Sequence, residues 1–452
     1  MNQRLSLILI VAGVALAAPS LAAGPITLDD AVRMALENNN ELRAADNSAR
    51  AASDRAKGAW GAALPQVNAR YMARRSDNPL DAFADKLNTR SVTSADLSPP
   101  EVLNTPDAST IHATQLSVEL PLFTGGRIRG GIREAGAYAD AARLAYEHRR
   151  EATAFRTQQA YRAVQASQQM LAITTDAVTA AREHAETTGR LARQGRIVAS
   201  DRLTAELNLS ASESAREQAA RAAREAQEQL RILLGLPANA ELAVTPWEKP
   251  RVPETVVDLA ESEKRALAAR RDLQSQEAFV KVHRARMTQA RSVFLPQVSV
   301  VATDSWYDRN AALENKSQAI MGMVSFNLFS GGRDYHAVRA AQHETDEAEE
   351  RLAAVRQGVH NDVRGAASRL TEARARVKIA EESVAKAQEN VRLIKQRYGE
   401  GRTILVDLLM SERMLIEARS EALHAALAED MSWAELRLAE GRLLESGVTT
   451  PN

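Results

Sequence analysis

The chain has 452 residues, in which 58 Lys and Arg balance 58 Asp and Glu, so its formal net charge is zero. This balance gives no indication of a basic surface for nucleic acid or of an acidic disordered tail. Cysteine is absent, which excludes disulfide bonds, thiolate metal sites and a lipid on an N-terminal cysteine. Aromatic residues make up only 4% of the chain, which favours closely packed long helices over a thick globular core.

The N-terminus has the pattern of a targeting segment. Arg4 precedes an apolar run from Leu5 to Ala18, and Pro19 and a group of small residues ending at Ala23 follow it. This order is typical of a cleaved secretory signal peptide, which we predict over residues 1–23. A membrane anchor is the alternative, but it would need ~20 apolar residues. We therefore expect the mature chain to be exported, without a lipid anchor.

Several short phrases occur twice along the chain, in the same order. "VELPLFTGGR" (118–127) returns as "VSFNLFSGGR" (324–333), and "ALPQVNARY" (63–71) returns as "FLPQVSVVA" (294–302). An internal repeat of this kind indicates that one architecture is written twice. We expect a first structural repeat over 24–245 and a second over 246–452.

The first repeat begins with helical periodicity from residue 28 to about 62, which stops before Pro65. Apolar and polar residues then alternate over 66–74 and 115–123, as in strands with one polar and one apolar face. Residues 75–113 are rich in Pro, Asp, Ser and Asn, which predicts a long surface loop. The result is a strand hairpin at 65–123.

The second repeat follows the same plan, with a helix from 258 to 293 and a strand hairpin at 296–329. Each strand hairpin ends in a pair of glycines, which let the chain change from strand to helix. These junction residues are Gly125 and Gly126 in the first repeat and Gly331 and Gly332 in the second.

Proline-free helical segments follow both glycine pairs. We predict long helical hairpins at 133–235 and 334–445, in which the first helix of each is on the order of 90 Å long. Long helices with alanine at close-contact positions pack as coiled-coil-like antiparallel pairs.

Four strands with one polar and one apolar face suit a membrane only if their edges are closed, because unsatisfied backbone groups in lipid are costly. Transmembrane barrels have at least about eight strands, so sister subunits are required. Two copies would give eight strands and a filled interior, whereas three would give twelve and an aqueous conduit, which favours three. The lumen would then be lined by Gln66, Asn68, Arg70, Gln115, Ser117, Glu119, Gln297 and Ser299.

We therefore predict an α+β membrane protein that is internally duplicated. It combines a long antiparallel α-helical coiled-coil barrel with a transmembrane β-barrel, with four strands per protomer and twelve in a trimer. The last strand is the least polar of the four, because Met321 and Met323 share its inward set. Five aromatic residues fit interfacial girdles in such a barrel, with ordinary packing as the alternative: Tyr71, Phe123, Trp306, Tyr307 and Phe329.

The phrases "LPQV", "PLFTGGR", "LLGLP" and "RYGEGRTILVDLL" resemble the TolC family of outer-membrane efflux proteins, over Ile26 to about Leu444. The resemblance implies a homotrimer with a barrel in the outer membrane and a helical tunnel through the periplasm. It also implies the role of exit duct in an efflux pump or a type I secretion system. The implied partners are a periplasmic adaptor protein, an inner-membrane transporter and outer-membrane lipid, with no nucleic acid.

The resemblance also assigns a gate to the two turns at 193–207 and 398–409, which we expect to be the periplasmic tips. Asp201 and Tyr398 would be hydrogen-bonding latch partners, and Asp407 would stand in a three-fold ring of carboxylates that favours cations. Thr403 stands where some relatives have a latch arginine, with Arg402 adjacent, so a weaker latch is a hypothesis. The alternative for both aspartates is helix N-capping, and for the tyrosine it is simple helix packing.

Other classes of function find less support. The chain has no H-E-x-x-H pair, no G-x-S-x-G elbow and no Gly-Lys-Ser/Thr phosphate loop, so we expect neither an enzyme nor a cofactor. A periplasmic adaptor protein also has long coiled-coil hairpins, but normally one, flanked by small β-domains. A soluble coiled-coil protein would not explain the alternation at 66–74 and 115–123.

Overall fold

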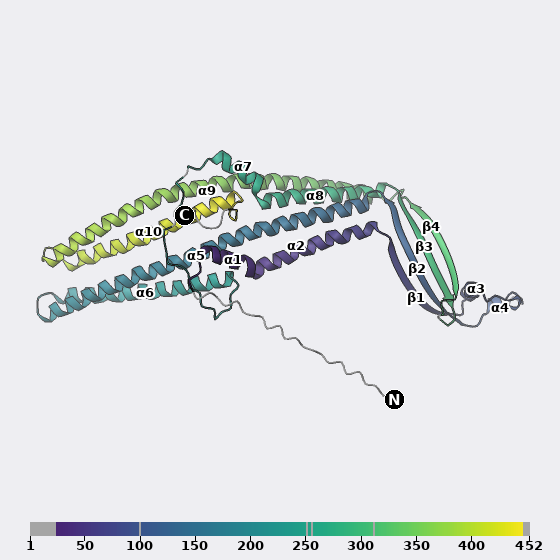
Figure 1. Cartoon of the computed structure of the whole chain (residues 1–452), viewed down its shortest axis with the longest axis horizontal. Coiled ribbons are helices and arrows are strands. Elements are labelled where there is room, and N and C mark those ends of the chain that lie inside the picture. Colours follow the sequence, from purple (N-terminus) through teal and green to yellow (C-terminus); the bar gives the residue numbers. More distant parts are fainter. Residues whose placement is uncertain (1–23, 99–100, 250–251, 255, 311, 446–452) are drawn as a thin grey trace, which may run out of the picture.

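The computed structural model describes residues 24–98, 101–249, 252–254, 256–310 and 312–445. The predicted signal peptide and the last seven residues of the second repeat lie outside the described residues. Long helices make up one end of an elongated molecule and a single sheet lies near the other (Figure 1). Among the described residues, no helix has the length and apolar character needed to cross a membrane.

The two halves of the chain contain matching elements, which confirms the internal duplication. The first half contains α1 (Leu28–Asn38), α2 (Asn40–Ala59), β1 (Gln66–Ser76), β2 (Ser109–Thr124), α5 (Arg127–Arg193) and α6 (Ala199–Leu233). The second contains α7 (Leu259–Ala269), α8 (Arg271–Arg291), β3 (Gln297–Asp308), β4 (Asn315–Ser325), α9 (Arg333–Gly399) and α10 (Leu405–Ala439). Helices α5 and α9 both have 67 residues, and α6 and α10 both have 35.

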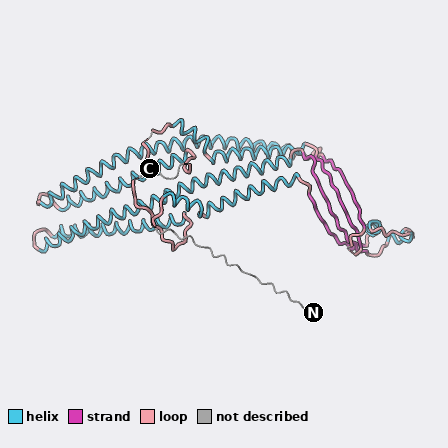
Figure 2. The backbone as a smooth tube through the Cα atoms, in the orientation of Figure 1, coloured by secondary structure: helices cyan, strands magenta, loops and turns pink. Residues whose placement is uncertain are grey.

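The four strands form one antiparallel sheet in the order β1-β2-β3-β4, so β1 and β4 are its edges (Figure 2). Strand β4 ends at Ser325, which lies opposite Gln297 at the start of β3, although the hairpin was expected to run to 329. The reason is local: Pro296 precedes β3 and has no N–H to donate, so residues beyond Ser325 have no partner to pair with.

The long surface loop expected over 75–113 instead contains regular elements. Strand β1 continues to Ser76, and helices α3 (Pro79–Asn88) and α4 (Glu101–Asn104) precede β2. A proline-rich composition favours loops, but Pro79 occupies the first turn of α3, where its missing N–H costs nothing. The Asn78 side chain caps the helix by accepting from the N–H groups of Leu80 and Asp81.

The helices expected at 28–62 and 258–293 are each broken once, at Asn39 and Arg270, where the backbone is extended. The end of α6 packs against the first break, and the end of α10 packs against the second. Gly235, just after α6, is so close to the first break that a Cβ there would lie 2.6 Å from the Asn38 carbonyl oxygen. Gly441 lies against Arg270 in the same way. Such tertiary packing has no signature in helical periodicity.

The largest core cluster lies at this level of the molecule, where α1, α5, α6 and α10 meet. Tyr161 of α5 is 1% exposed, and its hydroxyl donates to the Ile26 carbonyl (2.9 Å) and lies 2.7 Å from the Thr245 hydroxyl. A short parallel bridge joins Ile26 to Val244. The start of the chain and the segment between the two halves are therefore fixed to the same point of α5.

A buried carboxyl group lies beside this core. Glu151 of α5 is 8% exposed, and burial raises its pKa to about 7, although Arg271 opposes the shift. Asp272, Glu445 and Glu147 raise the pKa further. The folded chain therefore holds the Glu151 proton more tightly than the unfolded chain does.

This difference predicts a pH dependence of stability. Protonated Glu151 contributes stability that is fully present below about pH 4.5 and is lost as the pH rises to about 7. The loss is on the order of 3 kcal/mol. We expect Glu151→Gln to reduce the change in thermal midpoint, followed by the helical circular-dichroism signal, between pH 5 and 8, while Glu183→Gln, an exposed carboxylate of the same helix, keeps the wild-type slope. Parallel slopes for all three proteins would contradict this.

Candidate functional site

The register of the sheet brings the predicted polar residues onto one face. Three cross-strand pairs between β1 and β2 contain six of them: Gln66 with Glu119, Asn68 with Ser117, and Arg70 with Gln115. On β3, Ser299 lies opposite Pro121 and Gln297 lies opposite Thr124, beyond an irregularity between Pro121 and Phe123. We call this side the polar face. Met321 and Met323 of β4 also lie on it, opposite Val301 and Ser299.

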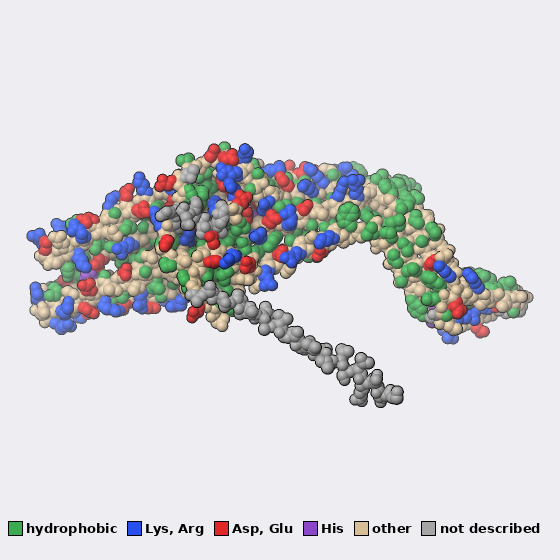
Figure 3. All heavy atoms as spheres, viewed as in Figure 1, with side chains coloured by type: hydrophobic (Ala, Val, Ile, Leu, Met, Phe, Trp, Pro, Cys, Tyr) green, Lys and Arg blue, Asp and Glu red, His purple; other side chains and the backbone are tan. Residues whose placement is uncertain are grey.

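The opposite side of the sheet is apolar and exposed. Its cross-strand neighbours include Val67 with Val118, Val298 with Val324, and Ala302 with Ile320. The side chains of Val67, Ile320 and Val324 are 64%, 82% and 70% exposed. Hydrophobic side chains spread over the strands in Figure 3, whereas charged ones cover the helices. A continuous apolar surface of this kind is normally covered by lipid or by another protein surface.

Polar and aromatic residues limit this apolar surface toward the α3 end. Tyr71 and Trp306 lie on it, both opposite Thr114, and the Tyr71 hydroxyl is 2.6 Å from the His112 Nδ1 atom. Lys316 lies over the Trp306 ring at 5.7 Å. Tyr307, by contrast, lies on the polar face, opposite Asn315, so it does not share the surface of Tyr71 and Trp306.

Both glycine pairs lie between a strand and a long helix, and all four residues have positive φ. The φ angles are 61° and 94° at Gly125 and Gly126, and 68° and 84° at Gly331 and Gly332. Residues with a Cβ rarely adopt this conformation. The turns are tight enough that α5 begins at Arg127, earlier than the expected 133. A Cβ on Gly125 would lie 2.5 Å from the Ser292 carbonyl oxygen, whereas one on Gly331 meets nothing within 4 Å.

The two tip turns, 194–198 and 400–404, lie at the ends of the helical hairpins, far from the sheet (Figure 2). They have the same backbone hydrogen bonds: the Arg196 N–H donates to the Leu191 carbonyl (3.0 Å), and the Arg402 N–H donates to the Arg397 carbonyl (2.8 Å). Gly195, just before Arg196, has a φ of 67°, and Gly401, just before Arg402, has a φ of 71°. Both turns are thus Schellman caps, which explains why the glycines recur in the two halves.

The structure brings Asp201 and Tyr398 together, although they belong to different hairpins. Asp201 lies in the first turn of α6 and Tyr398 in the last turn of α9, and both are half-buried. Burial raises the pKa of Tyr398, and the negative charge of Asp201 raises it further. No hydrogen bond joins the two side chains within the described part of this single chain.

The remaining tip residues interact within their own turn. The Thr403 hydroxyl donates to the Asp407 carboxylate (2.5 Å), and Arg402 pairs with Glu400 (2.9 Å). The N-cap residues of α6 and α10 are Val198 and Ile404, so neither aspartate is an N-cap. Asp201 and Asp407 instead lie in the first helical turn, where a negative charge interacts favourably with the helix dipole.

Two polar contacts between the hairpins were not predicted from the sequence. Arg162 of α5 donates to Asp430 of α10 (2.8 Å), and the His184 Nε2 atom lies 2.9 Å from the Glu412 carboxylate on the same pair of helices. Burial raises the pKa of Asp430, and Arg162 opposes this shift. The members of each pair are hundreds of residues apart, so only the three-dimensional structure reveals them. We call this line of contacts the α5–α10 seam.

One four-stranded sheet with a polar and an apolar face, continued by two long helical hairpins, is the architecture of a channel-forming membrane protein. The model for the outer membrane efflux protein family matches residues 31–236 and 264–442, so the chain belongs to this family. The TolC-like resemblance is thereby confirmed. The family consists of transport channels, so this chain is not an enzyme, and the adaptor interpretation is not favoured.

Solved structures with the same fold support this assignment. The CmeC outer membrane channel of Campylobacter jejuni is 18% identical with a TM-score of 0.79, over 92% of this chain and 85% of that one. The MtrE outer membrane channel of Neisseria gonorrhoeae is 18% identical with a TM-score of 0.76, over 94% and 91%. The outer membrane protein VceC of Vibrio cholerae is 17% identical with a TM-score of 0.75, over 92% and 96%. No curated protein sequence matches this chain.

The proximity of Asp201 to Tyr398 makes a testable prediction. Asp201→Asn removes a negative charge that opposes the phenolate, so the pKa of Tyr398 should fall while the contribution of burial stays. We expect Asp407→Asn, in the same tip as Tyr398, to leave this pKa unchanged, because Asp407 does not contribute to the shift. The measurement is an NMR titration of tyrosine labelled at Cζ, with the Tyr398 signal assigned from Tyr398→Phe. Equal titration in wild type and Asp201→Asn would show that the two groups are not close.

Proposed function

We propose that three copies of this chain form a passive exit duct in the outer membrane of a Gram-negative bacterium, gated at its periplasmic tips. The observation that carries the proposal is a sheet with an apolar face, a polar face and two unpaired edges, β1 and β4. In lipid, the free N–H and C=O groups of both edges need partners, and closure into a barrel provides them.

The duplication indicates how the copies would meet. Within one chain, β2 pairs with β3, and α5 packs against α8. The equivalent contacts across two chains would pair β4 with β1 of the next subunit and pack α9 against its α2. Large apolar side chains are exposed on both sides of this join. Trp60 and Leu64 are 62% and 59% exposed beside β1, and Leu328 and Phe329 are each 86% exposed after β4.

Three copies suit the polar face better than two. An eight-stranded barrel has room only for its own side chains, whereas twelve strands leave an aqueous channel. Charged and amide side chains such as Arg70, Glu119 and Gln66 would keep hydration in that channel and would lose it in a filled interior. We therefore assign the polar face to the lumen.

The energy for transport would come from partners, because the chain belongs to a channel family and carries no phosphate-loop motif. The tips present apolar side chains to solvent, including Val198 (63% exposed), Leu207 (72%) and Ile404 (64%). Such a surface suits a periplasmic adaptor protein that connects the duct to an inner-membrane transporter. A type I secretion system could use the same duct, but the family description as an efflux protein favours a tripartite efflux pump.

The join between subunits predicts the effect of one glycine. In the single chain, Gly331→Ala introduces strain from positive φ, about 1 kcal/mol, but no clash. In the trimer this position faces Gly61 and Leu64 of the next subunit, the equivalents of the residues that crowd Gly125. We expect Gly331→Ala to reduce the yield of trimer, measured by native mass spectrometry in detergent.

The matched control is Gly195→Ala, which has the same strain (φ +67°) and open space, but lies at a tip. Its trimer yield should equal that of the wild type. If Gly331→Ala behaves like Gly195→Ala, the proposed join is wrong, and a monomeric wild-type protein would refute the duct altogether.

The gate is tested by conductance in planar bilayers. Loss of the latch in Asp201→Ala should raise single-channel conductance several-fold over the wild type, because the tips are free to part. Asp407→Asn should lower cation selectivity, since it removes a ring of carboxylates from the narrowest part. Glu206→Gln, an exposed carboxylate on α6, serves as the control and should change neither property. Absence of a pore in every variant would rule out a conduit.

A further inference from the structure

The segment 77–108, between β1 and β2, has no counterpart in the second half of the chain. The equivalent connection between β3 and β4 is the short turn 309–314. We call 77–108 the insert. Its helices α3 and α4 lie beyond the end of the sheet, on the side away from the long helices (Figure 1). In the proposed duct this is the outer mouth of the barrel, and a trimer would carry three such inserts.

The insert is fixed to the polar side of the sheet through β1. Arg74 lies two and four residues beyond Met72 and Arg70, so it shares the face of Arg70. Its guanidinium pairs with Asp81 and with Asp85 of α3, both at 2.6 Å, and the Asp85 side chain is 9% exposed. Helix α3 therefore lies on the side of the sheet that we assign to the lumen.

A second attachment joins the other end of α3 to the opposite edge of the sheet. Arg90 follows α3 with φ of 53°, the left-handed position that glycine normally takes in a helix cap. Its side chain donates to the Lys316 carbonyl of β4 (3.1 Å). A non-glycine residue is held in this conformation only when its surroundings require it. The two attachments place α3 across the end of the sheet, from β1 to β4.

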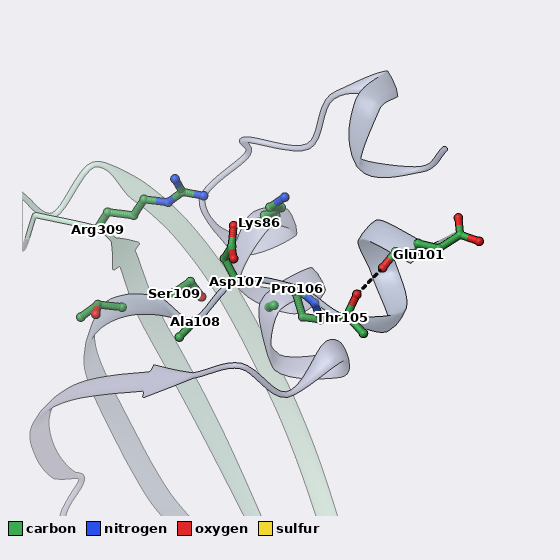
Figure 4. Close-up of a pocket in the computed structure, with 10 residues that line it drawn as sticks. Lys86, Glu101, Thr105, Pro106, Asp107, Ala108, Ser109 and Arg309 are labelled. Carbon is green, nitrogen blue, oxygen red and sulfur yellow. Dashed lines mark hydrogen bonds between the residues drawn. The ribbon is translucent and has the colours of Figure 1, made fainter. Parts of the chain in front are cut away.

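The charged residues of α3 are used within the subunit. Asp81 and Asp85 pair with Arg74, and Lys86 pairs with Asp96. A cavity of about 550 Å³ lies between the insert and the sheet. Lys86, Asp107 and Arg309 line it (Figure 4). Because the charged side chains of α3 are all paired within the subunit, none of them would oppose the approach of another copy.

Another side of α3 is apolar and bare. Leu80, Ala84 and Leu87 recur at the spacing of one helix face, and they are turned by about a quarter to a third of a revolution from Asp81 and Asp85. Leu80 is 81% exposed and Leu87 is 54% exposed. We call these three residues the α3 stripe. Because its own subunit leaves this stripe uncovered, another apolar surface that covered it would lower its exposure to water and gain stability.

We propose that the α3 stripes of three subunits pack against one another around the three-fold axis and narrow the outer mouth of the duct. The inference rests on the proposed trimer, which places three copies of the stripe symmetrically on the lumen side. The dimensions agree. A twelve-stranded barrel is ~24 Å across, so its wall lies ~12 Å from the axis, and a helix ~10 Å thick on the lumen side of each wall segment reaches nearly to that axis. The duct would then have a constriction at each end.

The experiment uses the absence of cysteine from the chain, because a single introduced thiol then reacts without background. Leu87→Cys and Leu80→Cys are prepared in the full-length protein, purified as trimers in detergent, and treated with a short bis-maleimide. Packing around the axis predicts covalent dimers on a denaturing gel. Crosslinks within a trimer should persist on dilution, whereas collisions between trimers should not.

The matched control is Leu97→Cys, which lies in the same insert outside α3 and is 56% exposed, close to the value of Leu87. We expect several-fold less dimer from it. If trimers form and Leu87→Cys and Leu80→Cys give no more dimer than Leu97→Cys, the α3 packing is overturned and the duct stands. If native mass spectrometry finds only monomers, both proposals fail.

Discussion

The need to pair backbone groups at the edges of the sheet governs the rest of this structure. Four strands whose outer face carries Ile320, Val324 and Val67 cannot remain in water without exposing that face, and cannot enter lipid with β1 and β4 unpaired. Closure with other copies resolves both problems at once. In the proposed duct it would also make the polar residues of each strand, which would be unfavourable in a solitary membrane sheet, the lining of a water-filled channel.

The duplication of the chain would make the proposed closure a nearly regular ring. Because α5 and α9 have the same length, and α6 and α10 also match, the contact between the halves of one chain can be repeated between chains. The two halves of the chain nevertheless differ in two places. The insert occurs once per chain, and Gly125 is enclosed by its own subunit while Gly331 is open. The contact at Gly125 is therefore made within one chain, whereas the equivalent contact at Gly331 would be made with another copy in the proposed trimer.

Much of the fold could be read from the sequence because its patterns are local. Alternation over 66–74, the glycine pairs and the turn glycines Gly195 and Gly401 each follow from backbone geometry at a few neighbouring residues. What escaped prediction depends on contacts between distant segments. The break at Asn39 is set by the docking of Gly235, and α3 was hidden because its proline starts a helix instead of ending one. At the tips, the Thr403–Asp407 hydrogen bond required the turn conformation itself.

The α5–α10 seam supports placing the proposed gate at the tips and not at the level of the core. Arg162 and Asp430 are 13% and 2% exposed, and removing one partner of such a buried pair leaves an uncompensated charge at a cost of about 3–5 kcal/mol. The Tyr161 contacts add to the stability of that level. Near the tips the polar side chains bond within their own turn, Arg402 with Glu400 and Thr403 with Asp407, and Val198 and Ile404 are exposed. Local opening costs least where the fewest contacts join the two hairpins, so the proposed gate would separate the ends of the hairpins while the core level stays closed.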